Sequence, residues 1–478
     1  MLRDLLKEGG LYTFANLLTR GINLFLIPFY TVYFTAQDYG VIEILSVFTL
    51  FVSNIFSLQF NQGIARYSAE PKLNHKHKVE FASTAILFSN GLLLLVTVLI
   101  ILFPTPLSNW LSGDTRVPID TIRLATATML FNGIFYLFST YLRFQRKSKA
   151  FAILSLSHAL SGILLIFLFV MVFDAGINSI YISYIIIVPI LIVIQMVLLK
   201  DHLVLKVNKV KLKKLLLFCL PLIPAAIAVV VMNFSDRIYI KKYLNYGELG
   251  IYGMASKFSS IISMIIGGFG MAITPILYEK QYEKGTKDEM KKIFKLFIGI
   301  GTTGVIALSF FSKEFVTLFT EKSFHPAANV MPIMYVSAYT AGFTMFSPGI
   351  ILKRKTIISA TIVIFFALIN IGLNHILVPK MGLNGAAIAT LIAMFSHQIT
   401  LFFISQKYYQ FNYSISQVAP VFIIQLALIG FFMFWNPELS FVNFLLKLGI
   451  LLLFVVFLFA IKLIDKRSVI RFIQRKDL

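Results

Sequence analysis

The sequence contains few charged residues, few acids and almost no cysteine. Only 13% of its 478 residues are charged, whereas a soluble domain carries roughly 25% because its surface must be solvated. Cys219 is the single cysteine, which excludes an internal disulfide framework and a cysteine-based metal site, so we expect it to be a packing residue. Hydrophobic residues make up 58% of the chain. These values indicate an all-α integral membrane protein.

Sequence patterns typical of enzymes are also missing. There is no Gly-x-x-x-x-Gly-Lys-[Ser/Thr] phosphate loop, which excludes ATP hydrolysis by that route. There is no His-Glu-x-x-His motif and no Cys/His cluster that would bind a metal. The predicted outer loops are short and hold few acids, which disfavours a sugar-transfer site. We therefore expect a protein without a cofactor that is not an enzyme.

Long apolar segments recur along the whole chain. A bilayer core requires about 20 apolar residues per helix, and we count about fourteen segments of that length. The predicted spans are 11–34, 41–64, 81–103, 119–142, 150–173, 179–199, 215–236, 249–276, 293–311, 329–352, 356–376, 384–404, 417–435 and 443–464. Pro221 and Pro224 are expected to kink the seventh span.

The 43 basic and 21 acidic residues give a net charge of +22. Nucleic-acid binding could explain such an excess, but the basic residues gather in the loops after even-numbered spans, such as 200–214 and 353–355. Loops after odd-numbered spans, such as 35–40 and 174–178, are poor in Lys and Arg. By the positive-inside rule, both termini are cytoplasmic, and no nucleic-acid partner is needed.

An internal repeat indicates two similar halves. Residues 33–41 align without gaps to residues 243–251, an offset of 210, and residues 176–178 align to 382–384, an offset of 206. Each pair leads into an even-numbered span, so the halves run parallel, as in transporters with repeats related by an axis along the membrane normal. The sequence thus predicts two six-helix lobes and a terminal helix pair, divided as a lobe at 1–199, a basic cytoplasmic linker at 200–214, a lobe at 215–404 and helices 13–14 with a cytoplasmic tail at 405–478.

Charges within the predicted spans are candidate substrate contacts, because a charge near the bilayer centre is costly unless it faces a polar cavity or a partner. Asn16, Arg20 and Asn23 form one polar stripe on the first span, with Arg20 about 13 Å from its inner end. Lys257 lies about 12 Å below the outer surface in the eighth span. Packing with acids is the alternative role for both cations, but no acid is obvious at their depth. We favour substrate binding for Arg20, and both roles stay open for Lys257.

Three further charged residues are weaker candidates. Arg66 ends a polar stripe at the cytoplasmic end of the second span, where an interfacial role is the simpler interpretation. Asp236 and Arg237 lie at the outer end of the seventh span, where a structural ion pair is the simpler interpretation. A chamber with more cations than anions suits an anionic group, and Arg binds phosphate bidentately.

Several motifs resemble Wzx-type polysaccharide flippases of the MOP exporter superfamily, which also contains MATE transporters and the lipid II flippase MurJ. The opening resembles this family at Ala15–Arg20, Ile27–Thr31 and Asp38–Gly40. Ser235–Ile240 with Glu248–Lys257 resembles its helix 7–8 segment, and Gly382–Ala389 resembles its helix 11–12 turn. The likeness covers most of the chain, and the order and spacing of the motifs carry it.

The resemblance implies alternating access around a central cavity in the cytoplasmic membrane. It implies that an undecaprenyl-pyrophosphate-linked oligosaccharide moves from the inner to the outer leaflet, with Arg20 matching a family position that binds pyrophosphate. Expected partners are this substrate, membrane lipids and other polysaccharide-assembly proteins. The alternatives are a MATE-like or other secondary transporter of a small molecule, which should carry lumenal carboxylates, and a membrane enzyme acting on lipid-linked sugars.

Overall fold

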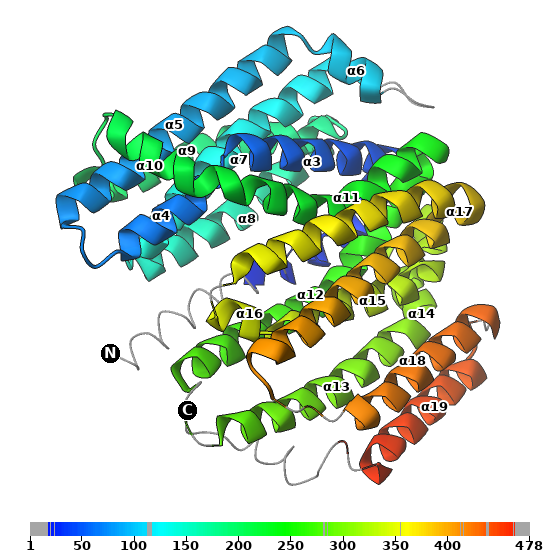
Figure 1. Cartoon of the computed structure of the whole chain (residues 1–478). Helices are drawn as coiled ribbons and strands as arrows, with labels where there is room; N and C mark the ends of the chain where they lie inside the picture. Colours follow the sequence, from blue (N-terminus) through cyan, green and yellow to red (C-terminus); the bar gives the residue numbers. More distant parts are fainter. Residues whose placement is uncertain are drawn as a thin grey trace. The chain divides into compact units, whose positions relative to one another are not determined.

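The computed structural model describes residues 18–19, 21–22, 24–111, 117–280, 283, 285–353, 355–411, 413, 415–435, 439–461 and 463. Every regular element in these ranges is a helix, in agreement with the predicted class (Figure 1). The chain divides into two compact units, residues 1–250 and 251–478, and each is described by itself. The predicted boundaries at 199, 214 and 404 stay predictions.

The first unit is built from paired long helices and shorter segments. Its helices α5, α7, α8 and α9 are each long enough to span a bilayer core at 1.5 Å per residue. The elements are α2 (Ile27–Tyr33), α3 (Ala36–Phe56), α4 (Phe60–Ala69), α5 (His75–Leu102), α6 (Thr105–Leu111), α7 (Ile119–Phe144), α8 (Ser148–Met171), α9 (Asn178–Leu198), η1 (Lys200–His202), α10 (Lys209–Cys219), η2 (Leu220–Leu222), α11 (Ile223–Tyr243) and the beginning of α12 (Tyr246–Lys280).

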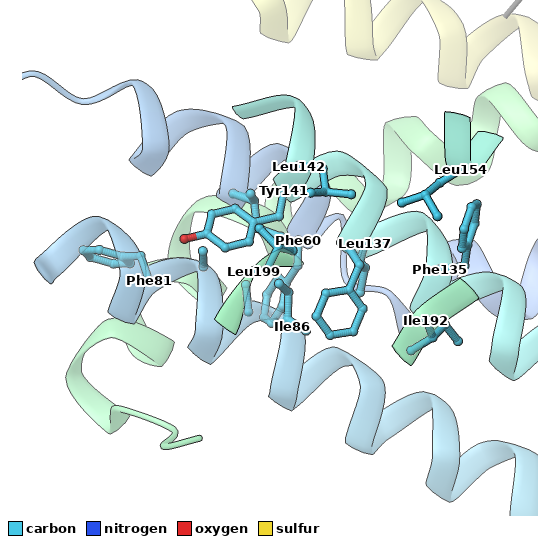
Figure 2. Packing of buried hydrophobic residues seen from close by; sticks show 14 of the residues in the cluster. Phe60, Phe81, Ile86, Phe135, Leu137, Tyr141, Leu142, Leu154, Ile192 and Leu199 are labelled. Carbon is cyan, nitrogen blue, oxygen red and sulfur yellow. The ribbon is translucent and has the colours of Figure 1, made fainter. Parts of the chain in front are cut away.

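The core of this unit lies where α4, α5, α7, α9 and α10 meet. Phe60, Ile86 and Tyr141 are buried there beside Leu199 (Figure 2), and Cys219 belongs to the same cluster. Association of helices in lipid depends on close van der Waals packing, since lipid tails are as apolar as the side chains. The cysteine is a free, buried thiol, in agreement with its predicted packing role.

Two predicted spans of this unit are interrupted. The second, 41–64, is broken between α3 and α4, because Leu58 and Gln59 have φ values of 51° and 54° in the left-handed region. Residues other than glycine seldom adopt this conformation, and it cannot continue a right-handed helix. The seventh span passes from α10 to α11 through the short 3-10 helix η2, and Pro221 and Pro224 lie at this junction. The predicted kink stays a prediction.

The second unit continues α12 and adds α13 (Thr286–Phe310), α14 (Ser312–Phe319), η3 (Lys322–Asn329), α15 (Met331–Thr340), η4 (Ala341–Phe346), α16 (Gly349–Leu352), α17 (Thr356–Tyr408), α18 (Ile415–Trp435) and α19 (Phe441–Ala460). Both α18 and α19 pack against α13, and Figure 1 shows them as neighbouring helices at the end of the chain. The predicted terminal helix pair is thus part of the second unit.

Eleven helices in the described ranges are long and apolar enough to cross a membrane, so the chain is a multi-pass membrane protein. The predicted first span is described only in part. The predicted tenth is divided into α15, η4 and α16, and the eleventh and twelfth form α17. Within α17, Gly382 has φ 58° and ψ −136°, a conformation open to glycine, and the helix folds back there (Figure 1). The count of fourteen and the location of the termini stay predictions.

Candidate functional site

Three of the predicted substrate contacts lie outside the described residues. These are Asn16, Arg20 and Asn23, the polar stripe of the first span. Their roles therefore stay predictions. The other four predicted residues are described: Arg66, Asp236 and Arg237 in the first unit and Lys257 in the second.

Asp236 and Arg237 form a buried cluster with Glu43, which we call the Arg237 cluster. Nη1 of Arg237 lies 2.9 Å from Oδ1 of Asp236, and its Nε lies 3.5 Å from Oε2 of Glu43. Nη1 also donates a hydrogen bond of 3.0 Å to the carbonyl oxygen of Asn233. Asp236 is 2% exposed and Arg237 4% exposed. The predicted ion pair therefore exists, with a second carboxylate that sequence reasoning did not single out.

Local structure explains how Glu43 reaches this position. Helix α3 begins at Ala36 with a capping box, in which the Thr35 hydroxyl accepts a hydrogen bond from the Asp38 amide and the Asp38 carboxylate accepts one from the Thr35 amide. Glu43 follows seven residues after Ala36, about 10 Å along the helix. Helix α3 packs against α11, so the carboxylate meets the guanidinium there.

The formal charge of the Arg237 cluster limits its chemistry. Two carboxylates face one guanidinium, and a buried charge is tolerated because its partners compensate for lost hydration. The two carboxylates therefore oppose the binding of an anionic ligand beside Arg237. The geometry supports a structural role for the cluster in the conformation described.

The two segments related by the sequence repeat meet at the edge of the first unit. A Cβ added to Gly40 would lie 1.9 Å from the carbonyl oxygen of Tyr246, and one added to Gly250 would lie 1.8 Å from that of Ala36. Residues 36 and 246, like 40 and 250, differ by the repeat offset of 210. The N-terminal turns of α3 and α12 thus approach each other through corresponding glycines, and small residues permit such close helix contacts.

Arg66 and Lys257 lie outside this cluster. The Arg66 side chain is exposed on α4, with its guanidinium carbon 4.2 Å from the centroid of the Phe218 ring. Among the described residues it forms no salt bridge. This cation–π contact suits the predicted interfacial position. Lys257 is half-buried on α12 of the second unit, and its carbonyl oxygen accepts a 2.6 Å hydrogen bond from Ser260.

The second unit contains a buried ion pair that sequence reasoning missed. Lys447 on α19 places its Nζ 2.6 Å from Oε1 of Glu314 on α14, and the Lys447 side chain is 2% exposed. A lysine inside the apolar run 443–464 was the available signal. Its partner lies 133 residues away, and no local pattern points to it. Lys447 lines a cavity of about 280 Å³ within this unit.

His158, a histidine within a predicted span, is a second feature that the sequence did not clearly indicate. His158 on α8 lies between the rings of Phe135 and Tyr184, at centroid distances of 4.8 and 5.0 Å. Its Nε2 lies 3.0 Å from Oδ1 of Asn132 on α7. The contacts on both faces and on the ring nitrogen indicate a helix-packing role in the first unit.

Comparisons with known proteins agree on fold. A structure of the lipid II flippase MurJ in an inward closed conformation aligns with a TM-score of 0.75 at 17% identity, covering 96% of this chain and all of that one. An inward-facing multidrug resistance MATE transporter of the MOP superfamily aligns with a TM-score of 0.64 at 15% identity, covering 83% of this chain and 94% of that one. This chain therefore has the MurJ and MATE fold, as its motifs predict.

Comparisons of sequence identify the family. An uncharacterized membrane protein of Methanocaldococcus jannaschii, MJ1068, is 25% identical over 174 residues, and the match spans about a third of each chain, 34% in both cases. Residues 5–281, more than half of the chain, match the polysaccharide biosynthesis protein family. The chain belongs to the polysaccharide biosynthesis protein family.

Proposed function

We propose that the protein is a flippase. It moves an undecaprenyl-pyrophosphate-linked oligosaccharide from the inner to the outer leaflet of the cytoplasmic membrane by alternating access. Two observations support the proposal. The structural alignment with the lipid II flippase covers 96% of this chain, and the chain belongs to a polysaccharide biosynthesis family. A fold that serves one lipid-linked saccharide suits another, because both substrates join a charged, hydrated head to a long apolar tail.

The pyrophosphate needs a cation within the membrane. Arg20 is our first candidate, since a guanidinium binds phosphate oxygens bidentately, and Asn16 and Asn23 share its helix face. Lys257 supplies a second charge, and Arg66 and the Arg237 cluster are secondary candidates. In this mechanism, the head crosses in a chamber between two lobes while the prenyl tail stays in lipid. This mechanism assumes the predicted fourteen spans and the predicted cytoplasmic location of both termini.

The alternative functions receive less support. A cation exporter needs carboxylates to bind its substrate, and the intramembrane carboxylates of Glu43 and Asp236 are both engaged with Arg237. An enzyme acting on lipid-linked sugars needs a catalytic group beside the substrate. The sequence contains neither the phosphate-loop motif nor the His-Glu-x-x-His motif that would point to such a group.

The test is reconstitution into vesicles with lipid-linked oligosaccharides, scored by the fraction accessible from the far leaflet. Arg20→Ala should lower the flipping rate roughly 10- to 150-fold, since a hydrogen bond to a charged group contributes about 1.5–3 kcal/mol. Lys72→Ala, which removes an exposed charge, is the matched control. Wild-type flipping by a well-folded Arg20→Ala variant would exclude the assigned contact. Consumption of the substrate without relocation would instead indicate the enzyme.

A further inference from the structure

The cavity beside Lys447 has the composition of a ligand site. It lies entirely within the second unit, where the end of α13, the beginning of α19 and the turn within α17 converge. Its volume of about 280 Å³ is close to the lower end of ligand pockets, roughly 300 Å³. Polar and apolar groups share the lining, which includes Ser309, Asn329, Asn384, Phe432, Met433 and Lys447.

Two lysines line this cavity, Lys313 and Lys447, and a carboxylate pairs with the second. The Lys447 ammonium is 2.6 Å from the Glu314 carboxylate, so its charge is largely compensated. The group is also almost completely buried, which fixes its geometry. A phosphate entering here would approach the carboxylate as well as the ammonium.

Among the described residues, the cavity lining holds one buried polar atom without a hydrogen-bond partner, and it is an acceptor. Oδ1 of Asn384, which lines the cavity, is buried and accepts no hydrogen bond from the described residues. Buried polar atoms without partners are costly, and each such atom in a native structure calls for an explanation. A ligand that satisfies this atom must donate a hydrogen bond. Phosphodiesters cannot donate, whereas hydroxyl groups can.

Aromatic surface completes the lining. The rings of Phe310 and Phe432 have centroids 3.7 Å apart, and both residues line the cavity. A ligand with hydroxyl groups at its rim and C–H groups on its faces matches this combination of amides and rings.

We propose that this cavity binds one sugar unit of a saccharide. The Asn384 amide oxygen accepts a hydrogen bond from a sugar hydroxyl, Lys447 donates to another, and Phe432 packs against the ring face. By the predicted topology, the ends of the ninth and thirteenth spans face outward, so the cavity meets a saccharide that has reached the outer side. This inference rests on the proposed flippase function and adds a saccharide site within the second unit.

Trp435 provides a direct reporter for binding. It lies on α18 with its ring centroid 5.4 Å from that of Phe432, and Trp110 is the one other tryptophan in the sequence. A Trp110→Phe variant of the full chain therefore reports from α18 alone. Titration in detergent with glucose, galactose, N-acetylglucosamine, rhamnose and glucuronic acid should give a saturable fluorescence change for at least one sugar, while glycerol gives none.

Substitutions at Asn384 separate the possible ligands. Asn384→Leu should weaken sugar binding roughly five- to tenfold, the effect of one lost hydrogen bond. Asn384→Asp keeps the acceptor and should retain sugar binding, whereas it would repel phosphate. Gly430→Ala, at an exposed position on α18 with no atom near the added Cβ, is the matched control and should bind as the parent does.

Two results would overturn the saccharide site. One is the absence of a saturable change with every sugar of the panel. The other is a change produced by inorganic pyrophosphate and abolished in Asn384→Asp, which would identify an anion site. Failure of this sugar site can be distinguished from failure of the flippase proposal, because the binding of free sugars in detergent requires no transport. Sugar binding without flipping would reject the transport function, and flipping without sugar binding would reject this cavity alone.

Discussion

Replacement of Gly40 by alanine tests the close contact between the repeated segments. An added Cβ would lie 1.9 Å from the carbonyl oxygen of Tyr246, more than 1 Å inside the 3.0 Å that Cβ atoms keep from other heavy atoms. The obstructing atom is backbone, so no side-chain rotation can relieve the clash. The N-terminal turns of α3 and α12 would have to separate by about 1 Å.

The expected loss of folding stability is the difference between two effects of the Gly40→Ala substitution. Overpacking costs typically 1–3 kcal/mol and occasionally more, and a backbone clash of this depth belongs at the upper end. Alanine stabilises the helix by up to about 1 kcal/mol relative to glycine, because its helix propensity is greater. We expect a net destabilisation of about 2 kcal/mol. At an unfolding entropy of about 2.1 cal/mol/K per residue, a chain of 478 residues loses roughly 1 °C per kcal/mol, so the apparent Tm falls by about 2 °C.

The assay is thermal denaturation of purified protein in detergent at one fixed heating rate, because unfolding of large proteins is often irreversible and scan-rate dependent. Gly91→Ala on α5 is the control, since no atom lies within 4 Å of its added Cβ, and it should melt at or slightly above the parent temperature. Adding Gly250→Ala to Gly40→Ala should cost less than the sum of the two, because one separation of the helices relieves both clashes. Parental melting of Gly40→Ala would refute the contact.

Two further predictions concern the buried charges. Lys447→Met should lower the free energy of unfolding by about 3 kcal/mol, because it leaves the partly buried Glu314 carboxylate without its cation. Adding Glu314→Gln should restore most of this loss in the same melting assay. A double variant as unstable as Lys447→Met alone would contradict the prediction. Arg237→Leu should lower the free energy of unfolding by about 3–5 kcal/mol. Adding Glu43→Gln should recover part of this loss. An unchanged Tm for Arg237→Leu would contradict a structural role for the Arg237 cluster.

The sequence predicted the class of the fold because hydrophobic length and charge asymmetry are local quantities. The repeat at an offset of 210 even marked Gly40 and Gly250, whose contact the structure describes. The breaks were harder to predict. Pro221 and Pro224 signal one of them, but Leu58 and Gln59 adopt left-handed conformations that their residue types disfavour.

Site partners were less predictable than spans, because they depend on helices that are distant in sequence. Glu43 and Arg237 are separated by nearly 200 residues, and packing of α3 against α11 alone brings them together. Lys447 lies in an apolar run but was not singled out, and its pairing with Glu314 became visible only in the packed second unit. The sequence identifies costly charges, and tertiary structure determines which of them are compensated.

The two buried clusters share an arrangement that bears on alternating access. Each joins helices of a single unit, α3 with α11 in the first and α14 with α19 in the second. Breaking a buried ion pair costs several kcal/mol, so these contacts favour units that stay intact. Rocking of near-rigid halves is the motion that repeat-built transporters use, and it leaves such internal pairs unbroken. Compensated cations then hold each half together, and the proposed binding of a pyrophosphate group would fall to a different cation, for which Arg20 is our candidate.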